Sequence, residues 1–561
     1  MSRVGRLAGR LHRVSDPPGK LGDALDTLDV DADAETVTAA ADSVAALLAV
    51  GTLLLAAFAS PRLRAPVLTV GAAVAVGGWW MLAHGPVTLA AARRRRAVGT
   101  APWLVCRAAM RLRVTPTAEA AAAFAGEGDR LLARRLSAHV RRARGTPRTG
   151  FERFRAEWGE RFPALDRALG SVQAAADAPA DEREAALDRA LDTILEGVRH
   201  CAAEDAAALR GPVTAVYAFG VLLPLALVAA LPAAAVAGLP VTVGTLVAGY
   251  DVALPLLLVA ASAWLVGKRP VAFPAAAVPR SHPEVPDARW PPLVAGLAAA
   301  IGAGILAGAL LARWAAPVAA AGAGVGTALA LRFRHERRVR ERIRGLESGL
   351  PTVLSRVGRA VTDGQSVERA LSMAAESTNG GAGDLLDDAV GRMERLGIGV
   401  EAAFLGDRGA LADVPSPRAA GVARLLAAAT REGRPAGDPL VAAGDHLDAL
   451  RRVERETRRS VRRLTATMGN TAGLFGPLVG GVTVALAGRM HGAELGRGVA
   501  VAALGPVVGW YVLVLAAVLT ALAVGLERGF DRAVVGFRVG VALLAATTTY
   551  LVAVHATRLV A

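Results

Sequence analysis

Apolar stretches long enough to cross a lipid bilayer recur along this chain, and they constrain its fold more than any other feature. A transmembrane helix needs about 20 apolar residues, because each residue rises about 1.5 Å through a hydrocarbon layer about 30 Å thick. Such stretches lie at residues 41–60, 65–85, 212–232, 241–266, 292–312, 316–332, 468–488, 497–525 and 532–553. We therefore predict a polytopic membrane protein with about nine transmembrane helices.

The composition favours helices in the polar parts of the chain as well. Hydrophobic residues make up 53% of the sequence, charged residues 20% and aromatic residues only 4%. Ala, Leu, Arg and Glu dominate the polar stretches, and these residues favour helices, whereas strands are enriched in β-branched and aromatic residues. We predict an all-α fold.

Two long polar stretches interrupt the apolar ones and define the predicted domains. The predicted order is a cytoplasmic N-terminal tail at 1–40, transmembrane helices 1–2 at 41–92, a first cytoplasmic helical domain at 93–210, transmembrane helices 3–6 at 211–332 with a cytoplasmic loop at 267–291, a second cytoplasmic helical domain at 333–466, and transmembrane helices 7–9 at 467–561. The first apolar run begins only near Ala41, so we expect no cleavable signal peptide.

The positions of the arginines predict the orientation of the spans. The net charge is +15, and Lys20 and Lys268 are the only lysines. Cytoplasmic flanks of membrane helices are enriched in Lys and Arg. With the N-terminus inside, the arginine-rich segments 93–96, 332–344 and 451–463 fall inside, while two arginine pairs, within 61–64 and 488–497, fall outside. Both polar stretches are therefore predicted to face the cytoplasm from the plasma membrane.

An internal repeat links the two polar stretches. Residues 101–127 align without a gap with residues 350–376, at a constant offset of 249. The paired residues are Pro102 with Pro351, Arg107 with Arg356, Thr117 with Ser366, Glu119 with Glu368, and Glu127 with Glu376. Each copy later runs into an apolar span that contains Phe-Gly and Pro. The same helical module is therefore predicted to occur twice.

Local chemistry explains much of what the copies share. In the second copy an apolar stripe at helical spacing comprises Leu350, Val353, Leu354, Val357 and Val361. Asp363 and Gly364 are expected to end that helix, and Ser366 to cap the next one, as Thr117 does in the first copy. Capping and packing alone account for the shared residues; contact with a partner is the alternative.

The duplicated module resembles a known family of membrane proteins. A helix that gives way to a glycine turn and "SVERAL" at 366–371, followed by a span with Gly and Pro, resembles the type II secretion system F-domain family. The layout of two such domains among nine spans is similar to its archaeal branch, the assembly platform proteins of type IV pili and archaella, and to the tight-adherence relatives. The resemblance covers about 93–232 and 333–488; the first copy has "VTPTAEA" where the second has "DGQSVERA", and lacks the turn glycine.

This resemblance implies a platform without catalytic activity of its own. Members lie under a growing filament in the cytoplasmic membrane, bind a hexameric secretion ATPase, and pass its motion to pilin-like subunits that leave the lipid bilayer; a homo-oligomer is compatible with this role. The candidate partner-contact residues are Arg107, Glu119, Glu127, Arg356, Glu368, Glu376, Arg338, Arg342, Arg455 and Arg459.

Two clusters of seven arginines, at 332–344 and 451–463, allow two interpretations. They anchor the inner flanks of the spans to anionic lipid and form ion pairs along the helix surface, or they dock an acidic surface of the ATPase. Binding of nucleic acid is not favoured, because the clusters lack interleaved aromatic residues and adjoin membrane spans.

The sequence contains no motif that predicts enzymatic chemistry. The phosphate loop G-x-x-x-x-G-K-[ST], the zinc motif H-E-x-x-H and the nucleophile motif G-x-S-x-G are all absent. Cys106 and Cys201 are far apart and match neither a disulfide framework nor a metal site. We expect no catalytic, cofactor-binding or metal-binding residues, so the energy for any mechanical work must come from a partner.

Two other functions remain open. A secondary transporter also combines many spans with a repeat, and a carboxylate inside the bilayer often marks a transport pathway. Asp251 is the one candidate for such a carboxylate, although a span that begins nearer Val252 would place it at the outer interface. The other alternative is a membrane scaffold that has no ATPase partner.

Overall fold

The computed structural model describes residues 21–28, 30, 33–58, 61–128, 130–146, 149–236, 242–269, 278–279, 282–286, 290–492, 501–529 and 531–560. Every regular element within these ranges is a helix. The prediction of an all-α fold is therefore confirmed for this part of the chain. Most of the predicted N-terminal tail, and most of the predicted loop at 267–291, lie outside the described residues.

Eight described helices or helical runs are long and apolar enough to cross a membrane. They are α3 (Ala34–Phe58), α10 (Ala180–Tyr217) with η1 (Ala218–Leu222) and α11 (Leu223–Val236), α12 (Val243–Leu246) with η2 (Val247–Ala253) and α13 (Leu254–Gly267), α14 (Trp290–Leu310), α15 (Ala315–Thr362), α20 (Gly437–Asn470) with η4 (Thr471–Phe475) and α21 (Gly476–Gly492), α22 (Val501–Arg528), and α23 (Arg532–Val560). The chain is thus a multi-pass membrane protein. The remaining predicted span, 65–85, lies within α4 (Pro61–Val98), and the count of nine stays a prediction.

Small residues allow two of these helices to pack closely. A Cβ atom added at Gly540 of α23 would lie 2.7 Å from the carbonyl oxygen of Gly326 in α15. Such an approach excludes any larger side chain at Gly540. In lipid, where helices gain little by hiding apolar surface from each other, close packing of small residues is a main source of helix association.

In the part of the chain that the structure describes, three short π-helical turns interrupt the apolar helices, and each ends two residues before a proline. η1, η2 and η4 are followed by Pro224, Pro255 and Pro477, respectively. Proline lacks the backbone N–H that an α-helix uses, and its ring clashes with the carbonyl group four residues earlier. A wider π turn relieves that conflict without ending the helix. The shared Phe-Gly and Pro of the two copies therefore correspond to the same local distortion, in η1 and η4.

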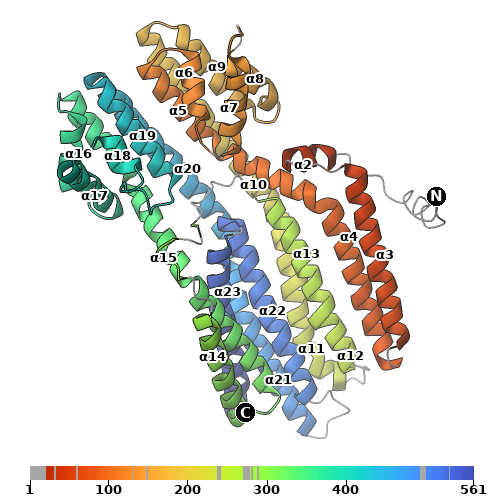
Figure 1. Cartoon of the computed structure of the whole chain (residues 1–561). Helices are drawn as coiled ribbons and strands as arrows, with labels where there is room; N and C mark the ends of the chain where they lie inside the picture. The colour runs from red at the N-terminus through yellow and green to blue at the C-terminus, as the bar shows by residue number, and fades with distance from the viewer. Residues whose placement is uncertain are drawn as a thin grey trace.

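Two groups of shorter helices lie at one end of the long apolar helices (Figure 1). The first helical group comprises α5 (Ala101–Val114), α6 (Ala118–Gly126), α7 (Leu131–Ala143), α8 (Gly150–Trp158), α9 (Pro163–Asp177) and the start of α10. The second helical group comprises the end of α15, α16 (Val367–Ser377), α17 (Gly381–Leu396), α18 (Val400–Leu405), α19 (Pro417–Glu432), the turn η3 (Arg434–Ala436) and the start of α20. Helices occur in the same order in both groups. The N-terminal helix α2 (Leu21–Leu28) lies apart from them.

The predicted helix ends are present in both groups. The Thr117 hydroxyl accepts a hydrogen bond from the Ala120 amide at 3.4 Å, and the Ser366 hydroxyl accepts one from the Arg369 amide at 3.2 Å. α15 ends at Thr362, and Gly364 follows with a φ of +93°, a conformation that favours glycine. The capping and turn predictions are confirmed.

Long continuous helices connect the second group to the apolar region. α15 is 48 residues long, which corresponds to about 70 Å at about 1.5 Å per residue. Its apolar stripe from Leu350 to Val361 is buried, as predicted. α20 runs without a break for 34 residues and continues into η4 and α21. One continuous helical run therefore links the start of α20 in the second group with the apolar region.

Candidate functional site

The two helical groups pack against each other through α5 and α6 of the first and α19 and α20 of the second. Their buried side chains form one continuous hydrophobic core. Met110 and Phe124 line a gap of about 30 Å³ together with Leu425 and Leu440. A Cβ atom at Gly421 would lie 2.5 Å from the Trp103 ring, so this glycine lets the indole of α5 pack directly on α19.

A larger cavity, here called the cleft, opens beside this contact. Its volume is about 540 Å³. The polar and aromatic residues that line it are Thr100, Trp103, Arg107, Glu127 and Arg130 from the first group, and Ser416 and Arg424 from the second. The described part of its lining therefore contains three arginines and a single carboxylate.

Arg107 is the most deeply buried arginine of the cleft. Its side chain is only 7% exposed and lies over the Phe124 ring, 4.6 Å from the ring centroid. It donates hydrogen bonds to the Glu127 carbonyl and, at 3.2 Å, to a Glu127 carboxylate oxygen. Burial lowers the pKa of Arg107, the Glu127 carboxylate opposes that shift, and the nearby charge of Arg424 adds to it.

Arg130 stands at the beginning of α7 and has a different environment. Its guanidinium group forms no hydrogen bond or ion pair among the described residues, although Glu347 and Glu454 attract it from a distance. Burial and the charge of Arg418 lower the pKa of Arg130. A half-buried cation without a direct partner is unfavourable, because it has lost water without gaining a counter-ion.

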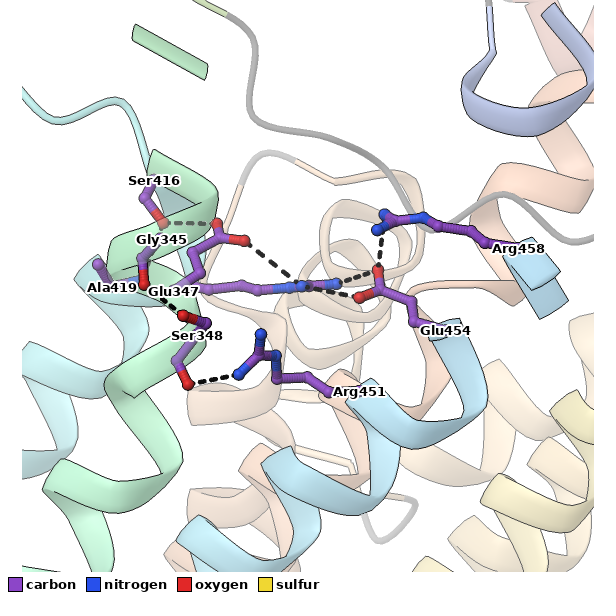
Figure 2. A network of polar contacts seen from close by, with 9 residues as sticks. Gly345, Glu347, Ser348, Ser416, Ala419, Arg451, Glu454 and Arg458 are labelled. Atoms are coloured by element: carbon purple, nitrogen blue, oxygen red, sulfur yellow. Dashed lines mark hydrogen bonds and ion pairs between the residues drawn. The ribbon is translucent and has the colours of Figure 1, made fainter. Parts of the chain in front are cut away.

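A network of ion pairs lies next to the cleft, and Figure 2 labels Glu347, Ser416, Glu454 and Arg458 in it. Arg418 of α19 connects α15 and α20 in this network. It contacts Glu454 of α20 at 2.7 Å and Glu347 of α15 at 3.5 Å. Ser416, the N-cap of α19, donates to the Glu347 carboxylate at 2.7 Å. Arg458 also lies 3.7 Å from Glu454. We call these residues the Arg418 network.

Because the network is buried, the loss of one of its charged partners is expected to destabilise the fold. The side chains of Glu454, Glu347 and Arg418 are only 6%, 15% and 18% exposed. Burial alone lowers the pKa of Arg418, but the carboxylates of Glu454 and Glu347 outweigh it and raise that pKa. Loss of one partner from a buried ion pair typically costs about 3–5 kcal/mol, because the remaining charge is left uncompensated. α15 and α20 are therefore held together through α19.

The candidate partner-contact residues that align in the repeat have different environments in the two groups. Arg107 and Glu127 form the ion pair described above, whereas Arg356 does not pair with Glu376. Arg356 instead donates to the carbonyl and, at 2.9 Å, the hydroxyl of Ser377, and to Thr378 at 3.1 Å. The other repeat residues are exposed: Glu119, Glu368 and Glu376.

The candidates from the arginine clusters are exposed on the two long helices. Arg338 and Arg342 lie on α15, and Arg455 and Arg459 lie on α20. Arg342 forms an ion pair with Glu284, at 2.5 Å, and Arg455 lies 3.9 Å from Asp448. Because these side chains are exposed, both interpretations of the clusters, lipid anchoring and docking, are physically open to them.

Sequence reasoning missed the cleft and the Arg418 network. Ser416 followed by Pro417 is a typical helix start, so the beginning of α19 was detectable. Glu454 is also unusual, because it adjoins the apolar positions Leu450 and Val453 within an arginine-rich segment. Neither signal says which distant residue completes the pair.

Asp251 lies in η2, within the candidate span Val243–Gly267. Its side chain is half-buried, and its Oδ1 atom has no hydrogen-bond partner among the described residues. This placement leaves the transporter alternative with a single residue in its favour.

Comparison of the chain with protein-family models, with curated proteins and with solved structures finds no match.

Proposed function

We propose that this chain is the cytoplasmic-membrane platform of a machine like those of type IV pili and type II secretion, and that it couples a cytoplasmic secretion ATPase to the assembly of pilin-like subunits. The resemblance of the duplicated module suggests the class of machine. The observation that carries the mechanism is the continuity of α15 and α20 between the second helical group and the apolar region.

The mechanism that we propose is mechanical. A push on the second helical group would move α15 and α20 together, because the Arg418 network joins them. Helices that continue without a break transmit such a displacement better than flexible linkers do. The π turn η4, where α20 gives way to α21, would then be the place at which the movement changes direction inside the bilayer.

The proposal also states on which side of the membrane the two helical groups lie. Both helical groups would face the cytoplasm, where arginine-rich flanks are retained. The exposed arginines Arg338, Arg342, Arg455 and Arg459 would meet an acidic surface of the ATPase.

The test combines binding with filament assembly. Full-length protein in detergent is expected to retain the purified secretion ATPase of the same cell, and charge reversal of Arg338, Arg342, Arg455 and Arg459 to Glu should weaken this binding more than tenfold. Arg189→Glu, on the exposed face of α10, is the matched control. Cells without the gene should lose surface filaments. Normal filaments in such cells, together with no affinity for the ATPase, would contradict the proposal and favour another role.

The transporter alternative makes its own prediction through Asp251. A transport role would require the carboxylate, so Asp251→Asn would abolish function, whereas the platform proposal expects filaments to persist in that variant.

A further inference from the structure

We propose that the cleft between the two helical groups binds a phosphate group of an anionic ligand. This inference does not depend on the function proposed above. It rests on the charges, the burial and the size of the cleft.

The charges in the cleft are unbalanced. Arg107, Arg130 and Arg424 line it, and Glu127 is the only carboxylate among the lining residues that the structure describes. That carboxylate is already engaged, because it pairs with Arg107 at 3.2 Å. The nearby carboxylates of Glu347 and Glu454 are engaged as well, by Arg418. Of the other two arginines, Arg424 is exposed, and Arg130 has no carboxylate in direct contact among the described residues.

Burial makes this imbalance meaningful. The exposed Arg424 needs no partner, but Arg130 is half-buried, and burial lowers its pKa. Arg107 has a side chain that is only 7% exposed, and its pKa is lowered although Glu127 is in contact. A bound anion would supply the missing charge and hydrogen-bond acceptors.

The donors of the cleft suit phosphate in particular. Guanidinium groups match the geometry of phosphate oxygens and bind them through two parallel hydrogen bonds. The N-terminal end of α19, at Ser416 and Pro417, also lines the cleft and adds the positive end of a helix dipole. The volume of about 540 Å³ lies within the range of small-molecule sites. Trp103 provides an apolar wall for the rest of the ligand.

The consequence of binding follows from the position of the cleft. Its walls come from both helical groups, so a ligand that contacts both would favour the packed arrangement over any arrangement in which they separate. The ligand would act as a clamp between the two groups.

Two sources can supply the phosphate: a soluble anion or the headgroup of an anionic lipid. The first arm of the test titrates purified full-length protein in detergent with inorganic pyrophosphate and follows binding by calorimetry. The second arm compares nanodiscs of phosphatidylcholine alone with nanodiscs that also contain phosphatidylglycerol, and follows thermal unfolding. Saturable pyrophosphate binding identifies a soluble ligand; stabilisation by phosphatidylglycerol alone identifies a lipid.

Arg130→Gln is the informative variant, because Arg130 supports no described contact whose loss would disturb the fold. It is expected to weaken the binding at least tenfold in whichever arm is positive. Arg134→Gln, one turn further along α7 and exposed outside the cleft, is the matched control and should bind as the unaltered chain does.

Two outcomes would overturn the proposal. One is that millimolar pyrophosphate does not bind and that phosphatidylglycerol, mixed in equal amount with phosphatidylcholine, does not raise the unfolding temperature. The other is binding that Arg130→Gln and Arg134→Gln weaken equally, which would show attraction to the general positive charge of the protein. Either outcome leaves the proposed platform function untouched.

Discussion

The two helical groups share an order of helices but join the membrane region differently. The first group begins after a break, because α4 ends at Val98 and α5 starts at Ala101. The second group begins inside α15, which continues from the apolar region to Thr362 without interruption. At their far ends both groups continue into an apolar helix, through α10 and α20, respectively. The second group is thus connected rigidly at both ends, and the first at one end only.

This difference suggests a division of labour within a repeated module. The second group also has the Arg418 network, which ties its two connecting helices together. The first group has Ala164 as the second residue of α9, where Arg418 is the second residue of α19. Its α5 and α10 are joined instead by ion pairs of Arg113 with Glu184 and Asp188. We infer that the second group transmits force, and that the first group supports it through the shared core.

The largest effect is expected from a break in α15. Two glycines inserted after the exposed Gly345 would rotate the second group by about 200° about the helix axis relative to the membrane region, since each residue turns about 100°. Two glycines inserted after Gly99, in the turn before α5, should be tolerated. Filament counts by electron microscopy should fall more than tenfold in the first variant and less than twofold in the second. Equal counts would remove the distinction between the two groups.

The Arg418 network should be the next most sensitive feature. Arg418→Met would leave Glu347 and Glu454 buried without their cation, and unfolding in detergent should become easier by about 3–5 kcal/mol. The control is Arg431→Met, which breaks an ion pair with Glu401 whose side chains are 72% and 59% exposed. Its cost should be below about 1 kcal/mol. Similar costs in both variants would show that the network is not a special connection.

A smaller difference in the free energy of unfolding is expected between variants of Glu127 and Glu376, the two carboxylates that align in the repeat. Glu127→Gln removes the charge that faces the buried Arg107, so the free energy of unfolding should fall by about 1–3 kcal/mol. Glu376→Gln alters an exposed side chain that does not pair with Arg356, and should change it by less than about 0.5 kcal/mol. Chemical denaturation of the two variants side by side gives the comparison. A larger cost at Glu376 would reverse the assignment.

The smallest effect concerns the cysteines of the first group. Burial raises the pKa of Cys106 to about 12, so at pH 8 only about one thiol in ten thousand is ionised and reactive. Burial and the nearby Asp205 also raise the pKa of Cys201. Its side chain is only half-buried, whereas Cys106 is buried, so Cys201 is the more accessible thiol. Alkylation followed by mass spectrometry should modify Cys201 well before Cys106. Modification of Cys106 at the rate of a free thiol would mean that the first group opens readily.

The sequence predicted the features that depend on neighbouring residues. The caps at Thr117 and Ser366 and the turn at Gly364 follow from short motifs, and the stripe of α15 follows from helical periodicity. The π turns coincide with Pro224, Pro255 and Pro477, and proline disfavours the regular α-helical turn before it. Proline alone does not predict such a turn, since Pro506 lies inside the continuous helix α22.

The cleft and the Arg418 network could not be predicted in the same way. Their members come from segments that are far apart in the chain, such as Glu347 and Arg418, and periodicity within one helix does not tell which helix lies opposite. Arg107 and Glu127 were singled out by the repeat, but the repeat also predicted equivalence with Arg356 and Glu376. That equivalence does not extend to the ion pair, since Arg356 contacts Ser377 and Thr378 instead.

The most direct test of the account asks whether both helical groups face the cytoplasm. Arg144→Cys and Glu394→Cys place single thiols on exposed positions of the first and second groups, in a chain whose own cysteines are replaced by serine. A membrane-impermeant maleimide should label neither thiol in intact cells and both after the cells are opened. Labelling of either thiol in intact cells would place that group outside, and the account of force passing from a cytoplasmic motor through α15 and α20 would be wrong.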